Sequence, residues 1–117
     1  MRAASIDLGS NSTRLLIADI TNGTITTISK EHQVTRMADK LSETKIISKE
    51  ATKRVLKVLA GYFKTINKNN IENIQIVGTA ALRDAKNSQE IIQLIEKKFG
   101  FEVDIVSGEE EGVLTSV

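Results

Sequence analysis

The sequence predicts an α/β fold with a mixed β-sheet, and two patterns support this prediction. Short apolar segments separated by small polar turns fill the first thirty residues, which is typical of an antiparallel meander of three strands. From residue 49 onward, amphipathic helical patterns alternate with short apolar strands, which is typical of strand-helix-strand units with parallel strands. The 117 residues, 40% hydrophobic and 26% charged, have the size and composition of one folded domain.

The three strands of the meander are expected at residues 3–8, 13–20 and 24–30. The turn between the first two strands has small polar side chains that favour a turn, namely Gly9, Ser10, Asn11 and Ser12. The Asn22-Gly23 pair follows the second strand and tolerates the positive φ of a tight hairpin.

Two helices and two further strands are expected after the meander. Residues 32–47 show no clear period, so an irregular connection is expected there. A helix is expected over residues 49–67, where apolar side chains recur along one face: Ala51, Val55, Val58, Leu59, Tyr62, Phe63 and Ile66. A second helix is expected after Asn87, with Glu90 completing a capping box, and it ends at Gly100. Strands are expected at residues 74–77 and 101–106.

The last residues suggest an incomplete domain. The acidic segment after the strand at residues 101–106 has the character of a helix that begins near Glu109. Residue 117 falls within this expected helix, and no terminating signal precedes it. We therefore expect the chain to be cut within this helix.

Composition excludes several classes of function. Sixteen Lys and Arg against fifteen Asp and Glu leave a formal net charge of +1, so no overall field draws the chain to nucleic acid or a membrane. Three Phe and one Tyr are too few for base-stacking platforms. The chain has no cysteine for thiolate chemistry, and its one histidine, His32, cannot form a zinc cluster alone. With no apolar run of membrane-spanning length, a cytoplasmic protein without nucleic-acid or membrane partners is expected.

Three polar segments, each directly after a predicted strand, can carry chemistry. Asp7 ends the first strand and offers a carboxylate to a divalent cation, and the turn that follows offers N–H groups and hydroxyls to a phosphate. Arg83 follows the strand at residues 74–77, where ligands gather in open α/β sheets, and its guanidinium can clamp a phosphate. The acids Glu109, Glu110 and Glu111 follow the last strand, where a carboxylate can activate a water.

Each segment also has a purely structural interpretation. The turn has the composition of any polar hairpin turn. Arg83 can pair at the surface with Asp84 or another acid, and three consecutive Glu residues suit the positive end of a helix dipole. Local arguments leave both interpretations open, but all three segments lie at strand ends along one expected edge of the sheet.

Together, the three segments resemble the exopolyphosphatase and guanosine pentaphosphate phosphohydrolase family, a branch of the actin, sugar kinase and heat-shock ATPase superfamily. The matching pieces are Ile6-Asp7-Leu8-Gly9-Ser10-Asn11-Ser12, Val77-Gly78-Thr79-Ala80-Ala81-Leu82-Arg83-Asp84-Ala85 and Val106-Ser107-Gly108-Glu109-Glu110-Glu111. Their order and spacing agree with the family, and the resemblance covers essentially the whole chain. It implies an actin-like (ribonuclease H-like) first domain, incomplete at residue 117, with a second domain and a second Gly-rich loop elsewhere.

The resemblance also implies roles for individual residues. Phosphate binding is implied for the turn of Gly9, Ser10, Asn11 and Ser12, with Asp7 near Mg²⁺ and Arg83 as a phosphate clamp. Glu111 is implied as the general base, and Glu110 is the neighbour that can be confused with it. The implied reaction is attack by a Glu111-activated water on a terminal phosphoanhydride bond of polyphosphate or on the 5′-phosphate of guanosine pentaphosphate, releasing orthophosphate.

Other interpretations stay open at this point. A module that binds nucleotide or polyphosphate without catalysis needs the turn but has no use for a base such as Glu111. Residues 1–117 alone are expected to have little or no activity, because catalysis in a cleft between two domains needs both walls. Polyphosphate and guanosine pentaphosphate are both expected partners, and a homodimer is one option for the intact protein.

Overall fold

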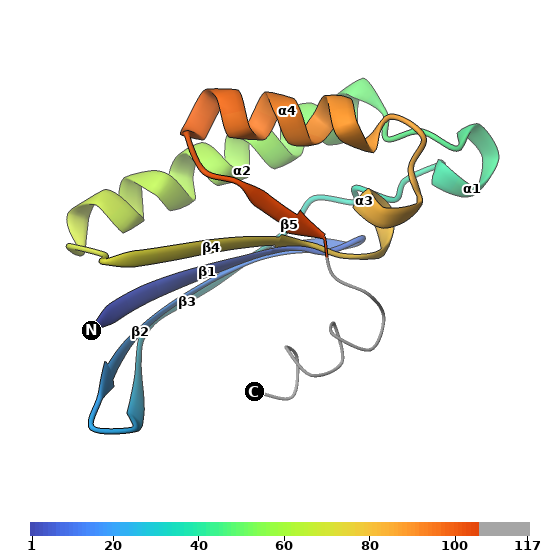
Figure 1. The fold of residues 1–117 in the computed structure, drawn as a ribbon. Helices are drawn as coiled ribbons and strands as arrows, with labels where there is room; N and C mark the ends of the chain where they lie inside the picture. The colour runs from blue at the N-terminus through green and yellow to red at the C-terminus, as the bar shows by residue number, and fades with distance from the viewer. Residues whose placement is uncertain (106–117) are drawn as a thin grey trace.

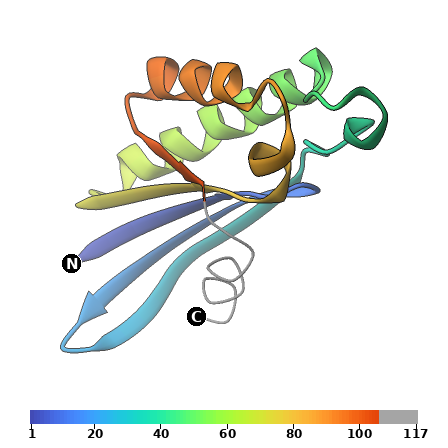
Figure 2. The ribbon, with the colours of Figure 1, turned by 45° about the vertical axis from the view of Figure 1, so that its right-hand side comes forward.

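A five-stranded mixed sheet forms the base of the molecule, and two long helices cover one of its faces (Figures 1 and 2). The computed structural model describes residues 1–105. The strands are β1 (Arg2–Leu8), β2 (Ser12–Thr21), β3 (Thr24–Val34), β4 (Asn73–Gly78) and β5 (Val103–Ile105). Their order in the sheet is β3-β2-β1-β4-β5, with β1 antiparallel to β2 and parallel to β4, and with β4 parallel to β5. The predicted α/β class and mixed sheet are confirmed.

The first three strands form the predicted meander, but β3 is longer than expected. The hairpin between β2 and β3 places Asn22 at φ 51° and Gly23 at φ 80°, as the Asn-Gly pair predicts. β3 continues four residues past Lys30 because the long β2 provides pairing partners as far as Val34. Its side chains are exposed or half-buried along its whole length, as expected of an edge strand, so no alternation of apolar residues marks its end.

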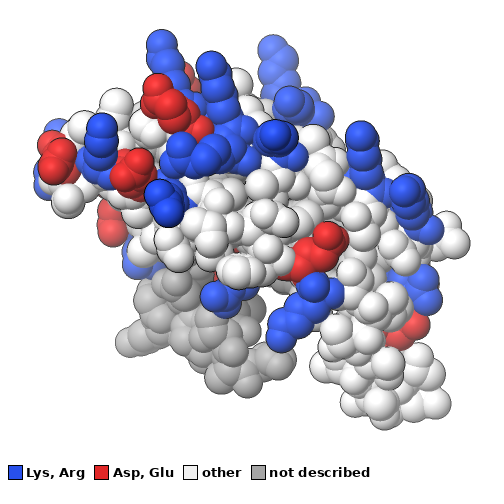
Figure 3. Space-filling model, turned by 180° about the vertical axis from the view of Figure 1, so that it is seen from behind, with Lys and Arg blue, Asp and Glu red and all other residues white. Residues whose placement is uncertain are grey.

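Helix α2 (Lys49–Lys68) matches the predicted amphipathic helix to within one residue. Ser48 caps it, with its side-chain oxygen accepting a hydrogen bond of 3.1 Å from the backbone N–H of Ala51. Six of the seven predicted apolar residues are buried against the sheet, and the seventh, Val58, is half-buried. The lysines of α2 lie on the opposite, exposed side of this helix, and Figure 3 shows basic side chains along the helical side of the molecule.

Helix α4 (Ser88–Phe99) begins and ends where the sequence predicts, but the predicted capping box is wrong. The Asn87 side chain makes no cap hydrogen bond to α4. Instead its Oδ1 accepts from the backbone N–H of Ile47 at 2.8 Å, and its Nδ2 donates to the carbonyl of the same residue at 3.0 Å. Asn87 therefore fastens the start of α4 to the segment just before α2.

The predicted strand at residues 101–106 is shorter in the structure. Among the described residues, strand β5 contains Val103, Asp104 and Ile105. Phe101 precedes it and stacks on Phe63 of α2, with ring centroids 5.4 Å apart. Phe99 stacks on the same ring at 4.8 Å, so both phenylalanines join the helical layer. The predicted helix start near Glu109 lies outside the described residues.

The connection from β3 to α2 is irregular, as predicted, except for one short helix. Helix α1 (Leu41–Thr44) has a single turn, and residues in the left-handed region flank it, with Lys40 at φ 60° and Lys45 at φ 65°. A further short helix that the sequence analysis did not predict, α3 (Ala80–Asp84), follows β4. Both short helices lie at the same end of the sheet in Figures 1 and 2.

The hydrophobic core fills the space between the sheet and helices α2 and α4. β1 contributes alternate residues to it, of which Ile6 and Leu8 are fully buried. Leu59 of α2 and Ile95 of α4 meet them from the helical layer, also without exposed surface. No helix in residues 1–105 combines the length and the apolar character needed to cross a membrane.

A first prediction concerns Asn87. Asn87→Ala removes both hydrogen bonds to buried Ile47 and leaves a backbone N–H and carbonyl without partners, so the free energy of unfolding should fall by about 2 kcal/mol. Asn67→Ala, on the exposed side of α2, is the matched control and should change it by less than about 0.5 kcal/mol. Urea unfolding of the three proteins measures both values, and equal losses would show that the Asn87 contacts are not stabilising.

A second prediction concerns the pH dependence of stability through Tyr62. Its hydroxyl donates to the carbonyl of Thr13 at 2.7 Å, and burial, with a smaller contribution from Glu31, raises the pKa of Tyr62 from 10.0 to about 12. A raised folded-state pKa stabilises the protein fully below pH 10, and this contribution disappears as pH rises through about 12. Tyr62→Phe should therefore cost about 1 kcal/mol at neutral pH. The difference in unfolding free energy between the two proteins should shrink steadily above pH 10, whereas a constant difference would contradict this assignment.

Candidate functional site

The turn between β1 and β2 is held by backbone hydrogen bonds from a distant segment. The N–H of Gly9 donates to the carbonyl of Ser12 at 3.0 Å and closes the turn. The carbonyl of Asn11 accepts from the N–H groups of Thr35 and Arg36, both at 3.0 Å, and the carbonyl of Ser10 accepts from Ala38 at 2.9 Å. The connection after β3 therefore fixes the turn that was predicted to bind phosphate.

Gly9 is required by this tight geometry. A Cβ atom at this position would lie 2.8 Å from the carbonyl oxygen of Ser12, closer than real Cβ contacts allow. Within residues 1–105, the N–H groups of Ser10 and Asn11 donate to no backbone carbonyl. Successive backbone N–H groups in a turn are the donors through which such turns bind oxyanions.

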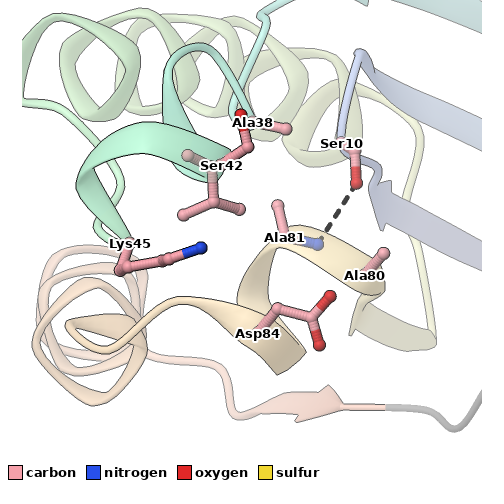
Figure 4. Close-up of a pocket in the computed structure, with 8 residues that line it drawn as sticks. Ser10, Ala38, Ser42, Lys45, Ala80, Ala81 and Asp84 are labelled. Atoms are coloured by element: carbon pink, nitrogen blue, oxygen red, sulfur yellow. Dashed lines mark hydrogen bonds between the residues drawn. The ribbon is translucent and has the colours of Figure 1, made fainter.

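The segment after β4 contacts the same turn. The backbone N–H of Ala81 donates to Oγ of Ser10 at 3.2 Å (Figure 4). Thr79 is buried and bonds to the carbonyl of Leu8 through both its N–H and its hydroxyl, each at 3.3 Å. Because β1 and β4 are parallel neighbours, their carboxyl ends meet, and the prediction that these two segments share one edge of the sheet is confirmed.

A second layer of buried polar groups supports the turn, and sequence reasoning did not find it. The hydroxyls of Thr13 and Thr35 lie 2.9 Å apart, both fully buried. Arg54 of α2 donates to the carbonyl of Thr35 at 2.8 Å, and Tyr62 donates to that of Thr13. These partners are 19 to 49 residues apart in the chain, so no local pattern marks them.

Asp7 lies next to the end of β1, with Arg14 and Val77 as its cross-strand neighbours. Within the described part of the chain, no three His, Cys, Asp or Glu side chains lie close enough together to hold a metal ion. Mg²⁺ in phosphate sites is commonly bound through one or two carboxylates, with water and substrate phosphates completing its shell. A single carboxylate at this edge fits that kind of site, and the role of Asp7 stays a prediction.

Arg83 lies on α3 with an exposed side chain. Its Nε is 3.8 Å from Oδ1 of Asp84, which is the surface pairing that the structural interpretation predicts. An exposed ion pair of this length contributes little to stability and does not exclude phosphate binding. The predicted base Glu111, with its neighbour Glu110, lies outside the described residues.

A pocket of about 460 Å³ opens beside the turn (Figure 4). Its walls come from the turn, from the connection around α1 and from α3, and its lining residues are Ser10, Ala38, Leu41, Ser42, Lys45, Ala80, Ala81 and Asp84. The ammonium of Lys45 points into it from the end of α1, and Asp84 lies on the α3 side. Sequence reasoning did not select Lys45, because the pattern around it is irregular and its position depends on the fold.

Comparison with known proteins supports the resemblance seen in the sequence. Residues 16–117 match the model of the Ppx/GppA phosphatase family. A guanosine-5′-triphosphate,3′-diphosphate pyrophosphatase of Vibrio cholerae is 38% identical over 108 residues, which are 92% of this chain and 22% of that protein.

Solved structures of the family share the fold. The Aquifex aeolicus family member is 35% identical, with a TM-score of 0.91 over 96% of this chain and 37% of its own. An exopolyphosphatase from Cytophaga hutchinsonii is 28% identical, with a TM-score of 0.92 over 97% of this chain and 36% of its own. The chain thus spans about a third or less of the length of these relatives, and the predicted actin-like fold is confirmed over that length. Residues 16–117 match the family model, and the fold is shared with both of these solved structures. This chain therefore belongs to the Ppx/GppA phosphatase family.

Proposed function

We propose that the protein hydrolyses terminal phosphoanhydride bonds, with inorganic polyphosphate or the 5′-phosphate of guanosine pentaphosphate as its substrate and orthophosphate as a product. The observation that carries this proposal is the Gly9–Ser12 turn, which is closed by a glycine and fixed by hydrogen bonds from two other segments. Relatives named as an exopolyphosphatase and as a guanosine pentaphosphate pyrophosphatase support the same class of reaction.

The chemistry of phosphoryl transfer suits a rigid site of this kind. Such reactions depend mainly on positioning and on stabilising negative charge, and they need no nucleophilic side chain. In the proposed site, N–H groups of the turn bind the oxygens of the terminal phosphate, and the guanidinium of Arg83 clamps the same group. Arg83 reaches it from α3, whose first turn is bonded to Ser10.

A metal ion and a base complete the proposed mechanism. Asp7 would hold Mg²⁺, which when bound neutralises charge on the phosphates. Glu111 accepts a proton from the attacking water, so the oxygen of that water forms the new bond to phosphorus as the bond to the leaving phosphate breaks. The chain spans 22% and 37% of the length of two of its relatives, and in the proposed mechanism the second wall of the cleft would come from a longer protein.

The turn itself is tested by Gly9→Ala. The added Cβ would lie 2.8 Å from the Ser12 carbonyl and force the turn open, so orthophosphate binding should be lost. Gly61→Ala is the matched control, because a Cβ at Gly61 meets no atom within 4 Å, and alanine in this helix should stabilise the protein by about 0.5–1 kcal/mol. Phosphate titration followed by amide NMR shifts compares the two. Unchanged binding by Gly9→Ala would refute the proposed phosphate turn.

Catalysis is tested by Glu111→Gln in the complete protein. The amide keeps the shape of the side chain but accepts no proton, so kcat on polyphosphate should fall by about 10²- to 10⁴-fold while KM changes little. Glu110→Gln is the adjacent control and should retain kcat.

Arg83→Ala should show a different defect, with KM raised and kcat lowered together, because a clamp acts in both the bound state and the transition state. If Glu111→Gln keeps normal kcat and Glu110→Gln does not, the base is Glu110. If both variants and Arg83→Ala bind and turn over normally, the chain supplies no catalytic group.

A further inference from the structure

The pocket beside the turn is lined by one cationic side chain, Lys45, that the proposed reaction does not use. Ser10 belongs both to the Gly9–Ser12 turn and to the pocket. Its carbonyl and hydroxyl accept the hydrogen bonds that brace the turn, and its side chain also lines the pocket. Lys45 and Ser42 face the same space from the α1 side, as Figure 4 shows for the Lys45 ammonium. A ligand bound at the turn can therefore extend into this pocket.

The main chain of Lys45 has a conformation that lysine does not favour. Its φ of 65° lies in the left-handed region, which glycine adopts readily and other L-residues adopt at a cost of about 1 kcal/mol. Two backbone hydrogen bonds fix this conformation, from the N–H of Lys45 to Leu41 at 2.8 Å and from the N–H of Lys86 to the carbonyl of Lys45 at 2.8 Å. Strain of this kind in an ordered segment is a reason to ask what the side chain does.

The lining of the pocket indicates which ligand it suits. Lys45 takes part in neither of the two ion pairs found among the described residues, and its ammonium is directed into the pocket (Figure 4). None of the eight lining residues is aromatic, so the pocket offers no ring on which a guanine could stack. Asp84 is the one acid in the lining, and its carboxylate lies beside the guanidinium of Arg83. These features favour the phosphate units of a linear chain over a nucleoside.

We propose that Lys45 binds a phosphate of a linear polyphosphate beyond the terminal one, in a second subsite formed by the pocket. This inference rests on the proposed function, since the terminal phosphate would lie at the Gly9–Ser12 turn. Lys45 then acts as a substrate-binding residue that selects for chain length. It has no part in transferring the proton or in cleaving the bond.

Two glycine variants separate this role from backbone strain. Lys45→Gly and Lys40→Gly each remove one positive charge from the same connection and relieve a left-handed lysine, at φ 65° and φ 60° respectively. Both variants should therefore fold, with an equal or higher Tm. Lys40 does not line the pocket, so only Lys45→Gly should affect a ligand there.

The measurement is the affinity of the 117-residue chain for orthophosphate and for tripolyphosphate, by calorimetry and amide NMR shifts at one fixed salt concentration. Lys45→Gly should weaken tripolyphosphate binding by about three- to tenfold and leave orthophosphate binding within about twofold, whereas Lys40→Gly should change neither by more than about twofold. Asp84→Asn should tighten tripolyphosphate binding, because it removes the one opposing charge in the lining.

The possible failures differ from one another. Equal effects of the two glycine variants on tripolyphosphate would overturn the Lys45 subsite and leave the phosphate turn intact. Equal loss of orthophosphate and tripolyphosphate in Lys45→Gly would also overturn it, because Lys45 would then belong to the terminal-phosphate site. Failure of the unmodified chain to bind either ligand would refute the phosphate turn itself, and the subsite with it.

Discussion

The central position of β1 determines where every other part of the candidate site lies. This strand pairs along its whole length with β2 on one side and from Ala3 to Leu8 with β4 on the other, while its alternate residues Ile6 and Leu8 are buried under the helices. Its carboxyl end therefore cannot move without breaking two ladders and the core. Asp7 and the following turn are fixed at this end, and the parallel pairing with β4 brings Thr79 and α3 to the same place.

Rigidity at this edge comes from backbone groups more than from side chains. The carbonyls of Leu8, Ser10 and Asn11 each accept at least one hydrogen bond from a segment that is distant in the sequence. Each bond contributes only about 1 kcal/mol, but together they restrict the turn from two directions. A site that acts by positioning benefits from such bracing, because its donors need little reorganisation when charge develops on the substrate.

Charge is distributed unevenly although its sum is close to zero. The net charge of +1 conceals a basic outer side of α2, which carries several lysines and a single acid, Glu50. That side faces away from the sheet, and its position makes it a solvated helix face (Figure 3). At the candidate site the basic groups are fewer. The Arg54 guanidinium is bonded to the Thr35 carbonyl, and two backbone hydrogen bonds hold the main chain of Lys45. The proposed recognition of a polyanion at this site would depend on the placement of charge more than on its amount.

Sequence alone determined the elements whose signals are local. The Asn22-Gly23 hairpin, the buried face of α2 and the polar turn after β1 all follow from periodicity and turn chemistry, and the combination of three polar segments indicated the family. Tertiary structure alone decided that Asn87 bonds to Ile47 rather than capping its own helix, that α3 forms after β4, and that Lys45 faces a pocket at Ser10. These features depend on partners 40 to 71 residues apart, such as Ile47 with Asn87 and Ser10 with Ala81. A local pattern contains no information about which distant backbone group will need a hydrogen bond, because that need arises only when the sheet and helices have packed together.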